Sequence, residues 1–184
     1  MTDHATPPAA PPDSTVVAAI VANALAEDRA GFDVTTRATV APDQRGEATI
    51  LYKQAGVVCG LDVVRETFRQ VSPEIEVRAS TSDGAWVESG TTVATISGPL
   101  GPMLSGERVA LNLMQRMSGI ATLAREYVEA AIAKLPDDER RVLRVFSTAS
   151  SMRDAARQLG MAESTYRVKL HEIITRIQPK SDAR

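Results

Sequence analysis

Apolar residues recur three and four positions apart in two early segments of the chain. Residues 15–27 and 61–71 each place a row of apolar side chains on one face of a helix. The stretch between them, RAGFDVTTRATV at residues 29–40, shows no such spacing and is predicted to be a loop. In the second helix the residues expected to rest on a sheet are Val63, Val64, Phe68 and Val71.

Alternating apolar and polar positions predict five strands. Residues 46–60 predict two of them, with Ala48, Ile50 and Tyr52 on one face. Three more are predicted at EIEVRAS, AWVES and TTVATISG, separated by Asp-Gly and Ser-Gly pairs that supply the positive φ angles of tight turns. The predicted fold class is α+β, beginning with an α/β sandwich that has a mostly antiparallel sheet.

A long helix is predicted after the strands, with Ser105 as its N-cap and Glu107 in its first turn. It links the sandwich to the C-terminal part of the chain, and Pro136 is expected to end it, because proline disfavours helical geometry at the preceding residue. The residues expected to line its core face are Val109, Leu113, Met117, Ile120 and Leu123.

Residues 134–178 predict a small all-α unit. Ser151 and Asp154 have the spacing of a capping box that opens its second helix, and Gly160 stands where a left-handed turn residue is needed. The side chains expected to face its core are Val142, Leu143, Phe146, Ala155, Ala156, Leu159, Tyr166, Leu170, Ile173 and Ile174. The predicted domains are thus residues 15–133 and 134–178, between a disordered Pro- and Ala-rich tail at residues 1–14 and a short tail at residues 179–184.

Composition places the protein in a reducing compartment. Cys59 is the only cysteine among 184 residues, which excludes an internal disulfide framework, and within GVVCG it is expected to be a small buried side chain. The absence of a targeting or membrane-spanning segment predicts a cytoplasmic protein. His4 in the Pro-rich tail is interpreted as a solvated residue rather than a ligand.

Charge is distributed unevenly. Residues 1–134 hold 11 Lys and Arg against 16 Asp and Glu, a net charge of −5, whereas residues 135–184 hold 10 against 7, a net charge of +3. A basic module on an acidic body is a weak indication of nucleic-acid binding.

Four ordered blocks carry a family resemblance: ALAEDRAGFDVTT, GVVCGLDVVRETF, DGAWVESGTTVATISGP and ERVALNLMQRMSGIATLAREYV. Together, over roughly residues 16–130, they resemble the N-terminal domain of quinolinate phosphoribosyltransferases, the nicotinate-nucleotide pyrophosphorylases of NAD synthesis. Phe32 departs from the family, which commonly has glycine before DVTT. In that family an α/β barrel comes next and holds phosphoribosyl pyrophosphate, magnesium and most of the quinolinate.

The residues after the long helix are too few for such a barrel, which needs about 200 residues or more. The chain alone is therefore not expected to transfer a phosphoribosyl group, and no catalytic residue, cofactor or metal site is assigned to it. The resemblance implies one ligand residue, Arg108 of ERVALN, which in the family reaches a partner's active site and pairs with a quinolinate carboxylate. A planar guanidinium suits that task, although Arg108 could instead satisfy neighbouring carbonyls or Glu107.

Residues 135–177 resemble the helix-turn-helix of sigma-factor region 4 and of LuxR-type regulators. The resemblance implies a recognition helix that lies in the major groove, with Arg167 on a base edge or a nearby phosphate. Ala162 departs from the Ser common at the cap of that helix, and His171 could equally be an ordinary exposed residue. The further residues assigned to this DNA-binding face are Ser164, Thr165, Lys169, Arg153, Arg157 and His171.

These observations support three hypotheses. The first is a DNA-binding transcriptional regulator whose enzyme-derived domain serves for dimerisation or for sensing an NAD-pathway ligand, with DNA and a second copy as partners and no membrane. The second is an accessory or inhibitory subunit that docks on a full-length nicotinate-nucleotide pyrophosphorylase. The third is a relic of gene rearrangement, which the intact hydrophobic pattern on both sides of Pro136 disfavours.

Overall fold

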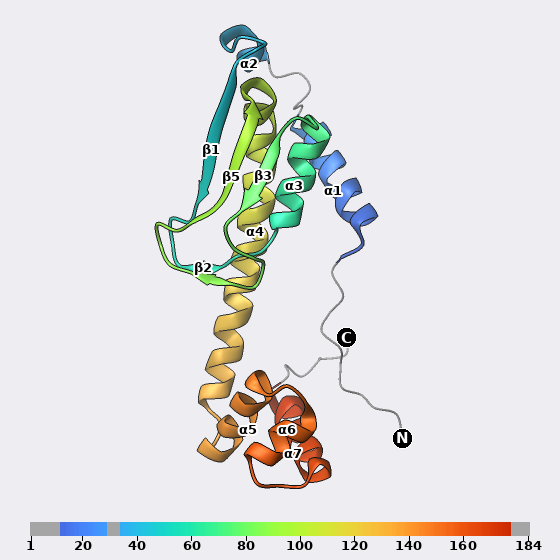
Figure 1. Cartoon of the computed structure of the whole chain (residues 1–184), viewed down its shortest axis with the longest axis vertical. Helices are drawn as coiled ribbons and strands as arrows, with labels where there is room; N and C mark the ends of the chain where they lie inside the picture. Colours follow the sequence, from blue (N-terminus) through green and yellow to red (C-terminus); the bar gives the residue numbers. More distant parts are fainter. Residues whose placement is uncertain (1–11, 29–33, 178–184) are drawn as a thin grey trace, which may run out of the picture. The chain divides into compact units, whose positions relative to one another are not determined.

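The computed structural model describes residues 12–28 and 34–177, which form two compact units divided between Thr122 and Leu123 (Figure 1). The first unit mixes helices with antiparallel strands, which confirms that part of the predicted fold class. The second unit contains helices and, within the described residues, no strand. The expectations for His4, Phe32 and the residues after Ile177 lie outside the described residues.

The main sheet has three strands in the order β1 (Arg45–Leu51), β5 (Thr92–Pro99) and β3 (Glu76–Ala79), all antiparallel to their neighbours. Two short strands, β2 (Gly56–Val57) and β4 (Trp86–Val87), pair separately. The predicted turn glycines Gly84 and Gly90 both have a φ of 87°, so each adopts the conformation that its turn requires.

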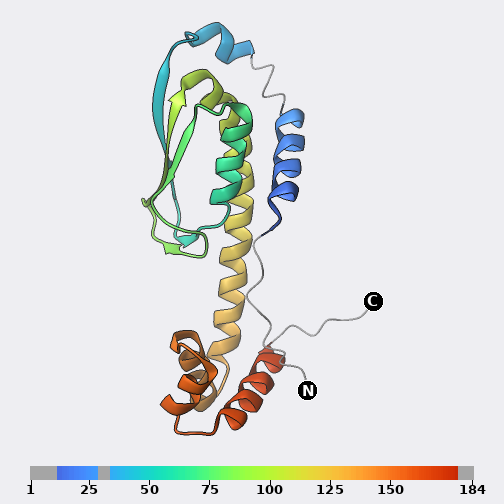
Figure 2. The same ribbon diagram turned by 45° about the vertical axis from the view of Figure 1, so that its right-hand side comes forward.

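One face of the main sheet is covered by α3 (Leu61–Val71) and by the first part of α4 (Leu100–Ala133) (Figure 2). These helices approach closely at Gly106, where a Cβ atom would lie 3.3 Å from the Phe68 ring. Apolar side chains from sheet and helices form one core. Its buried members are Ile50, Val58, Leu61, Val64, Phe68, Ile75, Val87, Val93, Ala94, Ile96, Met103, Ala110 and Met114.

The N-terminal helix α1 (Ser14–Glu27) is capped by Asp13, whose carboxylate accepts the Thr15 backbone N–H at 2.8 Å. A second helix, α2 (Val34–Thr39), occupies part of the segment predicted to be a loop, so that prediction was wrong there. Its sequence, VTTRAT, is rich in β-branched residues of low helix propensity, and it is too short to show helical periodicity.

Helix α4 begins at Leu100, so the prediction of Ser105 as its N-cap was wrong. Pro102 does not prevent this earlier start, because the N–H groups in the first turn of a helix have no intrahelical partner to lose. The Ser105 hydroxyl donates to the Gly101 carbonyl oxygen, one turn back within the helix, at 3.1 Å.

The apolar stripe of α4 is buried only in its first half. Val109 lies in the interior, and Leu113 and Met117 are half-buried, as predicted. Ile120 and Leu123 continue the same stripe but are exposed, Ile120 to 70%, which corrects the prediction that the whole stripe packs in the core.

A polar network joins Tyr52 and Cys59, which flank β2, to Ser118 of α4. Ser118 Oγ donates to the Cys59 carbonyl oxygen at 3.0 Å and accepts the Cys59 backbone N–H at 3.1 Å. Because the serine has only one hydroxyl hydrogen, the 2.6 Å contact between Tyr52 and Ser118 is then donated by the tyrosine. Burial raises the pKa of the Tyr52 phenol, which keeps it a neutral donor. Cys59 itself is half-buried, and burial raises the pKa of its thiol.

Ser118→Ala is expected to lower the free energy of unfolding of the α/β unit by about 1–3 kcal/mol, because it leaves backbone and phenol groups without partners in a buried place. Chemical denaturation followed by Trp86 fluorescence measures this, since Trp86 is the only tryptophan and lies in this unit. The control is Ser89→Ala, where the exposed hydroxyl donates to the Lys53 carbonyl oxygen and water can replace it. An equal effect of both substitutions would contradict the prediction.

The second unit contains α5 (Asp137–Thr148), α6 (Met152–Gln158) and α7 (Glu163–Ile177) after the end of α4. Ser151 caps α6 by accepting the Asp154 N–H at 3.1 Å, and Gly160 has a φ of 66°, both as predicted. A separate core contains Leu135, Val142, Ala155, Ala156, Tyr166, Leu170 and Ile173. Phe146 was predicted to be buried but is exposed, although it lies one helical turn after the buried Val142, so the core does not cover this end of α5.

No helix within the described residues is both long enough and apolar enough to cross a membrane.

Candidate functional site

Arg108 lies on the surface of α4, with 75% of its side chain exposed. Its Nη1 atom forms an ion pair with Asp28 Oδ1 at 3.2 Å. Asp28 is the C-cap residue of α1, 80 residues away in sequence, and only 23% of its side chain is exposed. The fold therefore places the Arg108 cation of α4 beside the C-terminal end of α1.

Exposed apolar side chains flank Arg108 on the same face of α4. Leu104 lies one turn before it and Leu111 one turn after it, and both are exposed. Arginine surrounded by apolar side chains is typical of protein interfaces, where arginine and large apolar residues are enriched. We call the surface formed by Leu104, Arg108 and Leu111 the Arg108 face.

The predicted DNA-binding face has a different character. Ser164, Thr165 and His171 are exposed on α7. Arg167 Nη2 lies 2.9 Å from Glu163 Oε1, and Arg153 Nε lies 3.3 Å from Glu163 Oε2. These hydrogen bonds from Arg167 and Arg153 lower the pKa of the Glu163 carboxyl, so it is ionised at neutral pH and neutralises much of the field of the two arginines.

The remaining cations of that face are paired as well or stand beside carboxylates. Lys169 Nζ contacts Asp138 Oδ2 at 2.7 Å, and this contact lowers the pKa of the Asp138 carboxyl. Arg157, in the last turn of α6, is exposed and interacts electrostatically with Asp154. A phosphate backbone is attracted by unopposed positive charge, which these pairs reduce.

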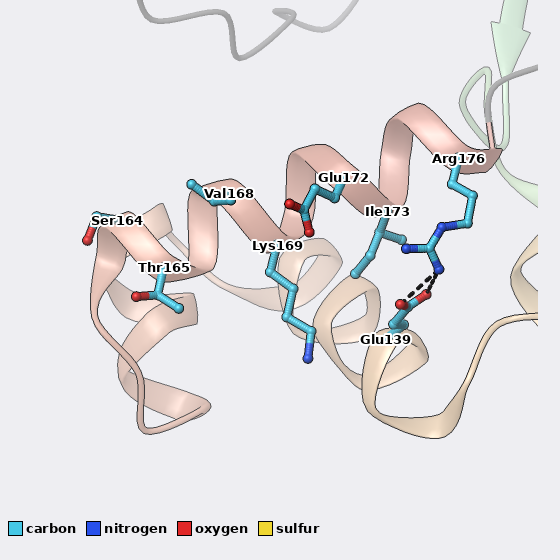
Figure 3. Close-up of a pocket in the computed structure, with 8 residues that line it drawn as sticks. All are labelled: Glu139, Ser164, Thr165, Val168, Lys169, Glu172, Ile173 and Arg176. Atoms are coloured by element: carbon cyan, nitrogen blue, oxygen red, sulfur yellow. Dashed lines mark hydrogen bonds and ion pairs between the residues drawn. The ribbon is translucent and has the colours of Figure 1, made fainter.

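An open hollow of about 490 Å³ lies on this unit, between α5 and α7 (Figure 3). Arg176 Nη1 reaches both carboxylate oxygens of Glu139 at 2.9 Å, and Glu172 adds a second carboxylate beside Lys169. The hollow thus mixes charges of both signs. Its lining residues are Glu139, Ser164, Thr165, Val168, Lys169, Glu172, Ile173 and Arg176.

Comparison with known proteins identifies the first unit. Residues 33–118 match the family model described as the quinolinate phosphoribosyl transferase N-terminal domain. This segment is a quinolinate phosphoribosyl transferase N-terminal domain. The domain contains Arg108 together with Leu104 and Leu111, whereas Asp28 precedes the matched residues.

Curated relatives of this phosphoribosyl transferase domain carry enzyme names. A probable nicotinate-nucleotide pyrophosphorylase (carboxylating) of Synechocystis sp. is 42% identical over 112 residues, which cover 61% of this chain and 37% of the relative. Quinolinate phosphoribosyltransferase (decarboxylating) 1b of Nicotiana tabacum is 38% identical over 113 residues, which cover 61% of this chain and 32% of the relative. The chain thus spans about a third of the length of these relatives.

Solved structures agree in fold. NadC from Streptococcus pyogenes superposes with a TM-score of 0.64 at 31% identity, over 68% of this chain and 44% of that protein. The nicotinate-nucleotide pyrophosphorylase from Francisella tularensis has a TM-score of 0.60 at 28% identity, over 65% of this chain and 42% of that protein.

These findings correct the leading functional hypothesis. The proteins named by the comparisons are pyrophosphorylases and phosphoribosyltransferases, so the prediction of a DNA-binding, helix-turn-helix transcriptional regulator with DNA as its partner was wrong. The structure also gives a physical reason against DNA binding. Arg153, Arg167 and Lys169, which were expected to meet phosphates or bases, are bound by carboxylates of their own unit.

Sequence reasoning missed Asp28, Leu104 and Leu111. Asp28 belongs to the quoted block ALAEDRAGFDVTT, but no spacing rule connects it to a residue 80 positions later. Leu104 and Leu111 lie at helical spacing from Arg108, and recognising that α4 begins at Leu100 would have placed all three on one face.

Proposed function

We propose that the phosphoribosyl transferase domain of this chain docks on a full-length nicotinate-nucleotide pyrophosphorylase as an accessory subunit and presents Arg108 to a carboxylate of quinolinate in that enzyme. The observation that carries this proposal is the exposure of Arg108 on α4 within the matched segment. Its guanidinium is a rigid, permanently charged fork that fits the two oxygens of a carboxylate.

The Arg108 face supports docking rather than an isolated site. Leu104 and Leu111 expose apolar surface on both sides of the guanidinium, and a partner that covers them gains the free energy of burying that surface. Removing water around Arg108 also strengthens its interaction with an anion. The chemistry itself belongs to the partner, to which this chain adds a binding group for the substrate.

Docking is tested with a purified full-length nicotinate-nucleotide pyrophosphorylase. Isothermal titration calorimetry and size-exclusion chromatography of the mixture are expected to show a complex that Leu104→Asp together with Leu111→Asp abolishes, because charges would then be buried against apolar surface. Absence of a complex with the wild-type chain at tens of micromolar overturns the proposal. A complex that stops turnover would make the chain an inhibitory subunit instead of an accessory one.

Arg108→Ala in that complex is expected to raise the KM for quinolinate about tenfold, because a charge-assisted hydrogen bond to a carboxylate contributes about 1.5 kcal/mol or more. Steady-state kinetics with the chain in excess measures this. Arg116→Ala is the matched control, since Arg116 is an exposed arginine on the same helix outside the Arg108 face. Equal KM values for Arg108→Ala and the wild type would contradict the assigned role.

A further inference from the structure

We infer that Asp28 is a positioning residue that orients Arg108 so that one complete edge of its guanidinium faces a carboxylate ligand. This inference rests on the proposed function, and it assigns a role to a residue outside the matched segment. It starts from the ion pair between the two side chains.

The contact between Asp28 and Arg108 uses only one corner of the guanidinium. Asp28 Oδ1 lies 3.2 Å from Nη1. A guanidinium is planar and carries five N–H donors, and those on Nε and Nη2 point in parallel along one edge. With Asp28 on Nη1, this edge is left for a ligand, and its spacing matches the two oxygens of a carboxylate.

The backbone of Asp28 is held by α1, whereas Arg108 carries a long and largely exposed side chain. The Asp28 backbone N–H donates to the Ala24 carbonyl oxygen at 3.0 Å, which fixes the residue to the last turn of α1. That helix is in turn anchored by the fully buried Val21 and by Gln70 of α3, whose amide donates to the Ala18 carbonyl oxygen at 2.9 Å. The Asp28 carboxylate therefore lies at the end of an anchored helix, where its ion pair can restrict the conformations of the long Arg108 side chain.

The position of Asp28 has a cost for the helix that carries it. A carboxylate at a helix C-terminus faces the negative end of the helix dipole, and no basic residue in the last turn of α1 offsets it. The positive charge comes from Arg108, on another helix. An acidic residue that is unfavourable for its own helix but paired with a candidate ligand-binding cation points to a role in placing that cation.

Orientation affects binding because an unrestrained arginine must give up side-chain freedom when it takes a ligand. A pre-existing ion pair removes part of that freedom in advance, so less affinity is lost on binding. The effect should appear in the affinity for the carboxylate, and therefore in KM, rather than in kcat.

Asp28→Asn tests the inference in the complex of the full chain with the full-length pyrophosphorylase, with quinolinate as the probe. The substitution is expected to raise the KM for quinolinate about three- to fivefold, because more side-chain freedom of Arg108 is then lost on binding, with little change in kcat and no change in association. In an Arg108→Ala background, Asp28→Asn should have no further effect, because Asp28 acts only through the arginine. An additive effect in the double variant, or an unchanged KM in the single variant, overturns the inference.

A second measurement needs no partner. In the isolated chain, the heteronuclear NOE of the Arg108 Nε–H group reports its order, and Asp28→Asn is expected to lower it while leaving that of Arg116 unchanged. If no complex forms but Asp28→Asn still lowers the NOE of Arg108, the proposed function is contradicted, whereas the orienting role of Asp28 is supported. If the complex forms and the order does not change, Asp28 does not orient Arg108.

Discussion

Replacing Tyr166 by alanine is expected to unfold the helical unit while the α/β unit stays folded. Tyr166 is fully buried in α7 at the centre of a core that shares no member with the core of the α/β unit. Removing a large buried aromatic side chain costs about 3–5 kcal/mol. A unit of this size has a total stability of only about 5 kcal/mol, so most of it would be lost.

Two signals separate the units in this experiment. Far-UV circular dichroism should show the loss of helix from α5 to α7 at low denaturant, whereas Trp86 fluorescence should keep the wild-type midpoint. Val168→Ala is the matched control, since Val168 lies two residues further along α7 and is 59% exposed. A joint shift of both signals would mean that the units unfold as one and would contradict two independent cores.

The hydroxyl of Tyr166 contributes little beside the ring. It donates to the Val142 carbonyl oxygen at 3.4 Å, which is long for such a bond. Tyr166→Phe is therefore expected to cost less than about 1 kcal/mol. This contrast assigns the stability of the unit to packing rather than to the hydrogen bond.

Local patterns in the sequence were sufficient to predict much of the fold. Phe68 and Val64 indicated α3, and Gly84 and Gly90 indicated turns, because each of these signals depends on neighbours within a few residues. Helix α2 was missed because VTTRAT has strand-like side chains and too few residues for a period. The exposed end of the α4 stripe was missed because spacing shows which residues share a face, not whether anything covers that face.

The candidate site was harder to predict from the sequence, because its ion pairs join residues that are far apart along the chain. The partners of Arg108 and Lys169 are Asp28 and Asp138, which lie 80 and 31 residues away in sequence. Counting the charges of residues 135–184 therefore indicated a basic unit, whereas in the fold many of its Lys and Arg side chains are paired with carboxylates. For the same reason, the net charge of +3 in residues 135–184 overstated the attraction of this unit for nucleic acid.

Gly98→Ala is expected to destabilise the α/β unit by about 2–4 kcal/mol, because strain and overpacking act together at this position. Gly98 lies in β5 with a φ of 157°, and an added Cβ would lie 3.0 Å from Ile75 Cα and 3.1 Å from the Glu74 carbonyl oxygen. Both contacts are backbone atoms, which cannot rotate away as a side chain can. The chain that leads into β3 would have to move, and Ile75 belongs to the core.

Gly90→Ala separates the two causes of this destabilisation. Gly90 has a φ of 87°, but an added Cβ would meet nothing within 4 Å, so the substitution adds conformational strain without crowding. Its cost is expected to be about 1 kcal/mol. Denaturation followed by Trp86 fluorescence should rank the variants as wild type, Gly90→Ala and Gly98→Ala in decreasing stability. If Gly98→Ala is no less stable than Gly90→Ala, crowding against residues 74 and 75 does not add to the cost of backbone strain.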